Sequence, residues 1–287
     1  MLVNRYVIKG NPVKRMIHKM IPKALKEKRN IQKYVAAFNK DHSVELQDVQ
    51  IETFNRCNGE CSFCPVNKHV DPRKPVMMEE ALFDKILSDL KAMNYTGKVT
   101  LDSNNEPLLD QRIYEFAKKA REVLPKAFIY IYTNGTLIDV EKTKELAKYL
   151  DEIVIDNYND DLVLNENIKP IQALCEKDPE LDKIVQIHLR KQHEVLYTRG
   201  GQAPNNEKQK ERNYPCFLPY RQLIIRPTGQ ISLCCSDALG TMTLGDVNTE
   251  SIGQIWNSDL YKEIRRKLKE EPNSLKLCRY CDSKHFS

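Results

Sequence analysis

Strand and helix signals alternate along residues 44–190, and this alternation restricts the fold more than any other feature of the chain. Apolar residues in alternation predict strands at 44–54, 98–103, 127–133, 152–156 and 183–189. Helical spacing between them predicts helices near 79–93, 111–123, 141–149 and 166–177. Strands separated by helices pair in parallel through right-handed crossovers. The sequence therefore predicts an α/β fold whose sheet is open or partly closed into a barrel, with its chemistry at the carboxyl ends of the strands.

The carboxyl-terminal third has a different pattern. Residues 191–215 are polar and contain Gly200-Gly201, which predicts a linker. Two short apolar stretches, 222–226 and 230–234, flank Pro227-Thr-Gly229 and predict a β-hairpin, and a helix follows at about 258–270. We therefore expect three parts, which are a basic helical arm (1–43), the α/β part (44–205) and a small carboxyl-terminal domain (206–287).

The composition excludes several classes of protein. With 41% hydrophobic and 30% charged residues among 287, the chain can bury a core and is not a disordered tail. No run of 18 apolar residues is present, so we expect no membrane-spanning helix. We also expect no secretory signal, and hence a cytoplasmic protein. Nine cysteines, an odd number, then argue against a disulfide framework and for metal or catalytic use.

The first group of cysteines directly follows the first predicted strand. Cys57, Cys61 and Cys64 stand in the segment Cys-Asn-Gly-Glu-Cys-Ser-Phe-Cys. Thiolates are the soft ligands that iron–sulfur clusters require. Three ligands on a four-iron cluster leave one iron open to bind a small molecule. The alternative is a zinc site with His69 as the fourth ligand.

The second group lies near the carboxyl terminus and consists of Cys216, Cys234, Cys278 and Cys281. Four thiolates can hold either a structural zinc ion or a fully ligated [4Fe–4S] cluster. Cys175 lies on a predicted helix and is expected to be a buried structural thiol. Cys235 neighbours a predicted ligand, so it is an alternative ligand or a packed thiol.

The spacing of the first group, after a first strand and ahead of βα units, resembles the radical SAM superfamily. The second group resembles the SPASM domain in its shortened, single-cluster form, often called the twitch domain. The resemblance covers roughly residues 50–287. It implies a partial (β/α)6 TIM-like barrel with a small hairpin-plus-helix domain for the auxiliary cluster. It also implies two [4Fe–4S] clusters, one of which binds S-adenosylmethionine (SAM) through its open iron, with Cys57, Cys61 and Cys64 as ligands of the first and Cys216, Cys234, Cys278 and Cys281 as ligands of the second.

The resemblance extends to the residues that would bind SAM. Phe63 matches the aromatic position that packs near the adenine. Asn104-Asn105-Glu106-Pro107 stands where the family usually has Gly-Gly-Glu-Pro. Asparagine tolerates left-handed backbone angles, so the turn can survive the loss of both glycines. Glu106 would then accept a hydrogen bond from the SAM ammonium group.

Three further strand ends match the family less specifically. Thr133-Asn134-Gly135 is similar to its Thr-Asn-Gly turn. Asp156 ends the fourth strand, where the family often binds the ribose, and Arg190 ends the fifth strand and is expected to pair with the SAM carboxylate. Each of these is, taken alone, also compatible with a surface turn or an ordinary ion pair.

The resemblance implies an enzyme that reductively cleaves SAM and removes a hydrogen atom from a substrate carbon. A flavodoxin- or ferredoxin-type protein would donate the electron. The expected outcome is two-electron oxidation or epimerisation of a small, carbohydrate- or aminocyclitol-like molecule, in which Cys235 could return the hydrogen atom. Epimerisation or cross-linking of a ribosomal peptide is an alternative. A zinc-binding scaffold without chemistry is the alternative from a different class.

The first 40 residues lie outside this resemblance and are strongly basic. They hold eleven Lys or Arg and one Glu, a net charge of +10, whereas the remaining 247 residues carry −5. Apolar residues from 17 to 38 have helical spacing, and Pro22 is expected to begin a second helix. Residues 14–40 could lie on an anionic membrane at its inner face or meet an acidic partner, or the arm could pack on the main domain. No specific nucleic acid is expected as a partner.

Overall fold

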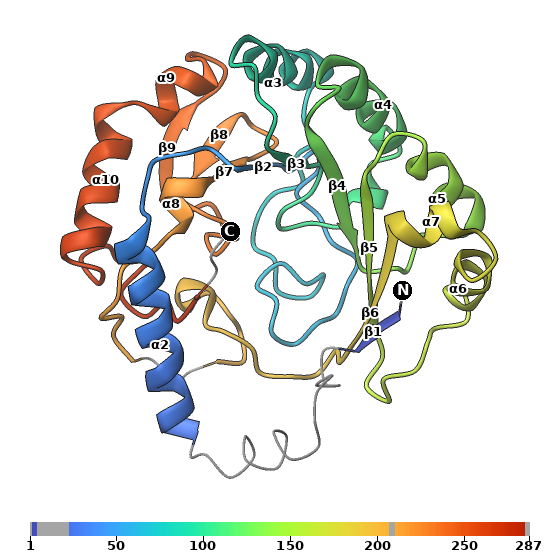
Figure 1. Cartoon of the computed structure of the whole chain (residues 1–287), viewed down its shortest axis with the longest axis horizontal. Coiled ribbons are helices and arrows are strands. Elements are labelled where there is room, and N and C mark those ends of the chain that lie inside the picture. The colour runs from blue at the N-terminus through green and yellow to red at the C-terminus, as the bar shows by residue number, and fades with distance from the viewer. Residues whose placement is uncertain (1, 5–22, 207–209, 285–287) are drawn as a thin grey trace.

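The computed structural model describes residues 2–4, 23–206 and 210–284. Its strands form one nine-stranded sheet in the order β1-β6-β5-β4-β3-β2-β7-β8-β9. The sheet curves around the centre of the molecule, and its helices lie on the outside (Figure 1). The strands are β1 (Leu2–Asn4), β2 (Asp48–Ile51), β3 (Lys98–Thr100), β4 (Phe128–Thr133), β5 (Glu152–Tyr158), β6 (Val185–Arg190), β7 (Gln222–Ile225), β8 (Gln230–Ser232) and β9 (Thr243–Asp246).

The parallel sheet predicted from the sequence is confirmed. Each neighbouring pair from β1 to β7 is parallel, and only the pairs β7–β8 and β8–β9 are antiparallel. All five strands predicted between residues 44 and 190 are present; the first three are shorter than predicted, β5 extends two residues further, to Tyr158, and β6 starts and ends later, at Val185–Arg190. The curved, mainly parallel sheet with outer helices is the partial TIM-like barrel that the family resemblance implies.

Helices cover the convex face of the sheet and close the hydrophobic core. Val49, Val99 and Ile129 are fully buried on this face. The rings of Phe83 and Phe116 stack at 4.2 Å between two of the helices. The helices of this part are α3 (Glu80–Ala92), α4 (Ile113–Val123), α5 (Val140–Ala147), α6 (Lys169–Cys175) and α7 (Pro179–Ile184), with the short 3-10 helices η1 (Pro107–Leu109) and η2 (Arg199–Gly201).

The carboxyl-terminal segment extends the same sheet. β7 pairs in parallel with β2, with Val49 opposite Leu223, and β7 and β8 form the predicted hairpin. The strands on both sides of the predicted boundary at residue 206 therefore belong to one sheet. Three helices follow the linker, namely α8 (Leu218–Arg221), α9 (Ile252–Trp256) and α10 (Asp259–Glu270).

Several short elements were not predicted, among them β1, β9, α7, α8, α9 and the two 3-10 helices. β1 and β9 are only three and four residues long, too short for a periodic pattern, and exist through pairing with β6 and β8. α7 begins at Pro179, with Asp178 accepting from two backbone N–H groups as its N-cap, and takes the first residues of the strand predicted at 183–189. A capping box between Ser251 and Gln254 begins α9.

Helix α2 (Lys23–Lys40) packs on the carboxyl-terminal segment through an aromatic face. The rings of Tyr34 and Phe38 lie 5.2 and 5.0 Å from the ring of Phe217, and Phe38 lies 5.4 Å from Tyr220. Lys28, Lys33 and Lys40 are exposed on the opposite side. The apolar stripe of α2 therefore serves an internal contact.

Two predictions from the sequence concern the start of the arm helix and the absence of a membrane-spanning helix. The first part of the predicted arm helix, up to Pro22, lies outside the described residues. Within the described residues, no helix is both long enough and apolar enough to cross a bilayer.

We predict that Phe38→Ala lowers the free energy of unfolding by about 3 kcal/mol, because this ring is 1% exposed and its removal leaves a cavity among four aromatic rings. Chemical denaturation followed by circular dichroism measures the change. Lys33→Ala, on the exposed face of the same helix, is the matched control and should stay within about 0.5 kcal/mol of the wild type. Equal stability of both variants would contradict the packing of α2.

Candidate active site

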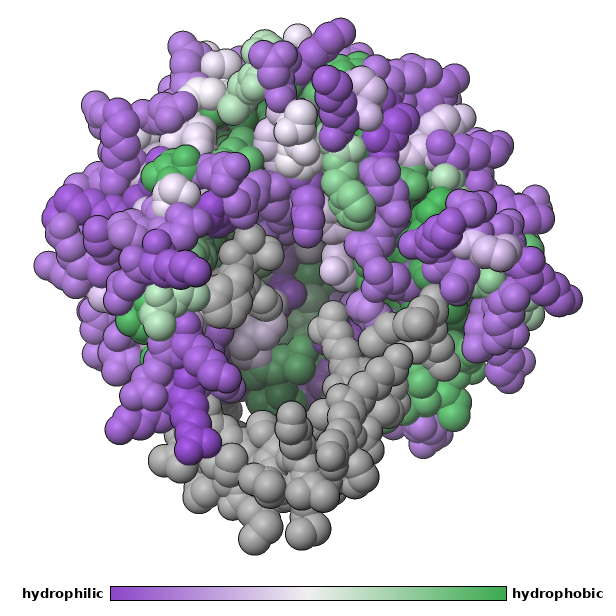
Figure 2. Space-filling model, in the orientation of Figure 1, coloured by the Kyte–Doolittle hydropathy of each residue, from purple (hydrophilic) through white to green (hydrophobic). Residues whose placement is uncertain are grey.

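A cavity of about 550 Å³ lies on the concave face of the sheet. Its floor consists of side chains that point inward from adjacent strands, because Gln50 stands opposite Thr100 and Thr100 opposite Tyr130 in the register. Figure 2 shows the hollow in the middle of one face, within a mainly hydrophilic surface. The volume is in the range of sites for cofactors and small molecules.

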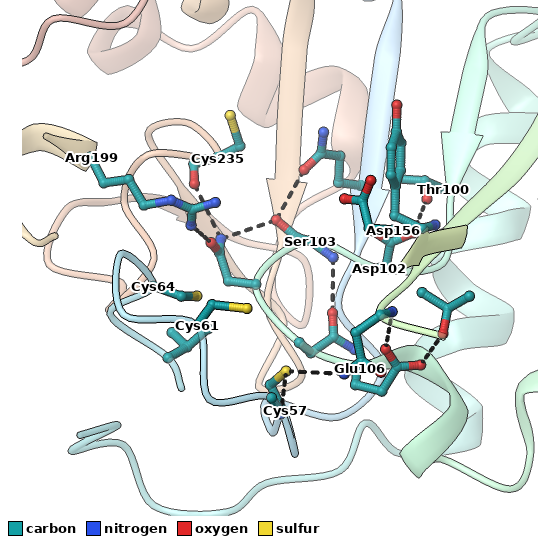
Figure 3. A pocket seen from close by; sticks show the side chains of 18 of the residues that line it. Cys57, Cys61, Cys64, Thr100, Asp102, Ser103, Glu106, Asp156, Arg199 and Cys235 are labelled. Atoms are coloured by element: carbon teal, nitrogen blue, oxygen red, sulfur yellow. Dashed lines mark hydrogen bonds between the residues drawn. The ribbon is translucent and has the colours of Figure 1, made fainter. Parts of the chain in front are cut away.

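The loop after β2 brings Cys57, Cys61 and Cys64 to this cavity (Figure 3). The amide of Gly59 donates to Cys57 Sγ at 3.3 Å. The side-chain amide of Asn67 donates to the carbonyls of Cys61 and Cys64 at 3.3 and 3.0 Å and so closes the loop. Parallel strands end at one edge of the sheet, and the position of the three thiols follows from this.

His69, the fourth ligand of the zinc alternative, does not line this cavity. Its imidazole side chain is 64% exposed, and Nε2 lies 3.5 Å from Glu60 Oε1. The structure therefore does not join His69 to the three thiols.

A largely enclosed arginine fixes the cysteine loop and was not found from the sequence. Arg73 donates to Glu52 at 3.1 Å, to Asp71 at 3.0 Å and to the carbonyl of Asn104 at 3.0 Å. It thereby ties the segment after the thiols to the turn after β3. One arginine in a polar loop gives no sequence signal for this role, because its partners are 2, 21 and 31 residues away.

Glu106 holds the ends of two strands together. Its carboxylate accepts from Thr133 Oγ1 and the Asn134 amide, both at 2.7 Å, and from the Leu108 amide at 3.1 Å. The side chain is 1% exposed, and burial raises the pKa of Glu106 to about 7. These bonds use three of the carboxylate's roughly four acceptor positions, so little capacity remains for a ligand.

The turn that carries Asn104 and Asn105 differs from our expectation in one respect. Neither residue has a positive φ, whereas Gly135 of the next turn has φ +77°. Side-chain hydrogen bonds shape the turn instead, since Asn105 Oδ1 accepts from the Ser103 amide at 2.9 Å. Both asparagines line the cavity, as do Thr133 and Asn134.

Asn104 also connects the barrel to the carboxyl-terminal segment. Its Nδ2 donates to the carbonyl of Cys235 at 3.3 Å, and its Oδ1 accepts from Arg199 Nη1 at 2.7 Å. Figure 3 shows Cys235 and Arg199 on the side of the cavity opposite Glu106. The sequence analysis did not identify Arg199 as a site residue. The feature that could have pointed to it is a cationic side chain directly before the pair Gly200-Gly201 in a linker.

Asp156 and Arg190 line the cavity and pair with each other. Arg190 Nη1 lies 2.9 Å from Asp156 Oδ2, and His188 Nδ1 lies 3.2 Å from Asp156 Oδ1. The pairing raises the pKa of Arg190 despite its burial. Phe63 is the one predicted SAM contact that does not line the cavity. Its ring packs behind Tyr158, with the Arg190 guanidinium 5.7 Å from the ring centroid.

The second group of cysteines surrounds a separate, buried cavity with apolar walls. Cys216, Cys234, Cys278 and Cys281 all line it and are each 7–8% exposed. The thiol of Cys175 is also buried, but it packs in the core beside α6, as predicted, and lines neither cavity.

Two polar groups in this second cavity fit an anionic metal–thiolate group. Arg212 is 2% exposed and donates to four backbone carbonyl oxygens, and no carboxylate among the described residues pairs with it. The hydroxyl of Ser236 is buried and, in the part of the chain that the structure describes, has no hydrogen-bond partner. A buried cation and an unused donor beside four thiols suit a group of negative charge.

Geometry alone does not decide between zinc and iron–sulfur. Within the described residues, no three His, Cys, Asp or Glu side chains converge closely enough for a single metal ion. The family models decide: residues 51–166 match the radical SAM superfamily, and residues 216–282 match SPASM, described as an iron–sulfur cluster-binding domain. The chain is a radical SAM enzyme. Its cofactors are SAM, a SAM-binding [4Fe–4S] cluster and an auxiliary [4Fe–4S] cluster, and the zinc-scaffold alternative is set aside.

This radical SAM enzyme is similar to known proteins along most of its length. It is 25% identical over 240 residues to the S-adenosyl-L-methionine-dependent 2-deoxy-scyllo-inosamine dehydrogenase of Niallia circulans, which covers 82% of this chain and 92% of the relative. Among solved structures, BtrN in complex with AdoMet and 2-DOIA has a TM-score of 0.72 at 21% identity, over 85% of this chain and 97% of that one. SuiB of Streptococcus suis, bound to precursor peptide SuiA, has a TM-score of 0.56 at 16% identity, over 90% and 73%. Both solved structures, BtrN and SuiB, have the same fold as this chain.

Proposed function

We propose that this enzyme is a dehydrogenase of a small, aminocyclitol-like substrate. The relative from Niallia circulans supports this, because 92% of its length is matched and its name describes such a reaction. The cavity supports it too, because its lining offers carboxylate, amide, phenol and guanidinium groups to a polyhydroxylated ring. The donors and acceptors on that lining include Gln50, Asp102, Tyr130, Arg199 and Gln222.

We propose Cys57, Cys61 and Cys64 as the ligands of the SAM-binding cluster, and Cys216, Cys234, Cys278 and Cys281 as those of the auxiliary cluster. When bound, the first cluster supplies the electron that cleaves SAM to the radical which removes a hydrogen atom from the substrate. Arg212 offsets negative charge at the auxiliary site. The dry, apolar walls of that site exclude water from it.

The SAM contacts proposed from the sequence are compatible with the cavity to different degrees. Glu106 fixes the turn and Asn134 stands beside Cys57, with Nδ2 3.7 Å from Sγ. Arg190 pairs with Asp156 through Nη1 at 2.9 Å, and its Nη2 lies 3.7 Å from Glu194 Oε1, so a SAM carboxylate would share this guanidinium with both side chains. The pair fixes both side chains, so the proposed ribose and carboxylate contacts form one preorganised unit. Phe63 would act through Tyr158 and Arg190, on which it packs.

The main observation in favour of an oxidation reaction is that the two cavities are adjacent. Cys234 lines the thiol-rich cavity, and its neighbour Cys235 lines the substrate cavity. Leu218 lines both. An electron leaving a substrate radical therefore has one residue to pass before it reaches the auxiliary site. That adjacency favours net two-electron oxidation.

Epimerisation is the second candidate, because Cys235 lines the substrate cavity and could donate its thiol hydrogen atom to a substrate radical. Peptide modification, as in the complex of SuiB with a precursor peptide, has only the shared fold in its favour. We therefore place oxidation of a small molecule first.

The partners beyond the substrate also belong to this proposal. We propose an acidic, flavodoxin- or ferredoxin-type electron donor and a cytoplasmic location. An anionic membrane surface for residues 14–40 stays a prediction. Since Tyr34 and Phe38 are buried against the carboxyl-terminal segment, the described part of α2 offers such a surface only its lysine-bearing side.

We predict that Cys57→Ala abolishes SAM cleavage and lowers the iron content of anaerobically purified protein from about eight to about four atoms per chain. 5′-Deoxyadenosine and iron are measured together. Cys175→Ala is the matched control, because this thiol lies in neither cavity, and it should retain both readouts. Continued 5′-deoxyadenosine formation by Cys57→Ala would contradict the ligand assignment.

We predict that turnover of 2-deoxy-scyllo-inosamine in deuterated buffer gives a product two hydrogens lighter, without deuterium at the reacting carbon. Cys235→Ala should keep this oxidation, because an oxidised product needs no returned hydrogen atom. Mass spectrometry distinguishes the outcomes. Deuterium at a carbon centre of an unoxidised product, lost in Cys235→Ala, would show epimerisation in place of oxidation.

A further inference from the structure

Six charged side chains of the described residues line the substrate cavity. Four of them have an ion-pair or hydrogen-bond partner within the protein. Asp156 and Arg190 pair with each other at 2.9 Å. Glu106 accepts three hydrogen bonds from the neighbouring turns. Asp48, deepest on β2, accepts from three side chains, those of Gln50 at 3.0 Å, Tyr130 at 2.9 Å and Gln222 at 2.8 Å. The two charges that remain are Asp102 and Arg199.

Asp102 has one oxygen committed and one uncommitted. Its Oδ1 accepts from the Thr100 hydroxyl and from the Tyr132 amide, the latter at 2.9 Å. Within the described residues, Oδ2 accepts no hydrogen bond and the carboxylate has no ion pair. The side chain is 6% exposed, and burial together with nearby Glu106 raises the pKa of Asp102 to about 7. A buried carboxylate without a cation is costly unless a ligand supplies one.

Arg199 is the complementary case. It gives Nη1 to Asn104, and its guanidinium lies 5.5 Å from the centroid of the Tyr197 ring and near the Cys64 and Cys235 thiols. It has no carboxylate partner among the described residues. Its own φ is +47°, a left-handed value that costs free energy for a residue with a side chain and that the two following glycines share. Among the described residues, the cavity thus holds one carboxylate and one guanidinium without an oppositely charged partner.

We propose that Asp102 binds the protonated amino group of the substrate, while Arg199 donates to its oxygen atoms. This inference rests on the proposed function and assigns the residues that bind the amine of its substrate. A carboxylate whose Oδ1 is fixed by Thr100 and Tyr132 presents Oδ2 in one direction, and an ammonium group gives it a charge-assisted hydrogen bond. A hydroxyl group at the same ring position would give a weaker, neutral one.

The test compares 2-deoxy-scyllo-inosamine with the same ring bearing a hydroxyl group in place of the amine. Asp102→Asn is suited to it, because the amide oxygen can still accept from Thr100 and Tyr132 while an NH2 group replaces Oδ2. We expect kcat/KM for the amine to fall about tenfold to 100-fold, with the hydroxyl compound affected less than threefold. Asp48→Asn is the matched control, a buried aspartate of the same cavity with both oxygens occupied, and should affect both compounds alike.

The outcomes separate this inference from the proposed function. If the wild type oxidises both compounds equally well and Asp102→Asn does not discriminate between them, the ammonium site is refuted while the dehydrogenase stands. If the wild type cleaves SAM and oxidises neither compound, the proposed function fails and the ammonium site with it. Iron content and SAM binding of Asp102→Asn, measured alongside, show that the fold is intact.

A second, independent observation concerns the auxiliary site. The Ser236 hydroxyl is buried, has no hydrogen-bond partner among the described residues and lines the cavity of the four thiols. We infer that it donates a hydrogen bond to a sulfur atom of the auxiliary cluster. Hydrogen bonds to cluster sulfurs stabilise the reduced state and raise its reduction potential, which makes the cluster a better acceptor of the substrate electron.

A redox titration of the auxiliary cluster, followed by electron paramagnetic resonance, tests this role. Ser236→Ala should make the midpoint potential more negative with unchanged iron content. Ser232→Ala is the matched control, because Ser232 also has a buried hydroxyl without a partner but does not line the cavity. Equal potentials in wild type and Ser236→Ala, or an equal shift in both variants, would refute the hydrogen bond.

Discussion

The parallel pairing of β2 with β7 is the contact on which the arrangement of both sites depends. β2 leads into the loop of Cys57, Cys61 and Cys64, and β7 begins the hairpin that ends at Cys234. β8 runs antiparallel to β7 and returns toward the amino ends of β7 and β2, where the Cys235 amide donates to Gln222, the residue opposite Asp48. The pairing of β2 with β7 therefore brings two groups of cysteines more than 150 residues apart in the chain to neighbouring cavities.

Smaller contacts refine that arrangement. Arg73 joins the cysteine loop to the turn after β3, and Asn104 in that turn contacts both Cys235 and Arg199. The chain of contacts thus runs from the first group of thiols, through the turn that replaces two glycines, to the carboxyl-terminal segment. This explains why asparagine suits position 104: glycine could make neither side-chain bond. The departure from the family motif adds a link between the two parts of the enzyme.

The charge of the substrate cavity follows from the same inward-facing positions. Alternate residues of β2, β3 and β4 face the cavity, and they are polar, whereas the residues between them are apolar and face the helices. Most of the buried charge is neutralised by pairs or by backbone N–H groups. The charges of Asp102 and Arg199 lack an oppositely charged partner among the described residues, so a substrate can pair with them. Specificity and stability therefore depend on different members of one polar cluster.

The sequence by itself determined the parallel α/β fold, both groups of cysteines, the hairpin and the turns at Glu106 and Thr133, because each is encoded in local periodicity or short spacing. It did not reveal Arg73, Arg199 or the free oxygen of Asp102, whose partners are distant in the chain or absent from it. It also left open whether the stripe of α2 meets a membrane or the protein. Only the tertiary structure answered that for the described part of the helix, since burial of Tyr34 and Phe38 requires Phe217 and Tyr220 to be nearby. Local patterns specify elements and ligand types, while pairing between remote segments decides which charges are left for chemistry.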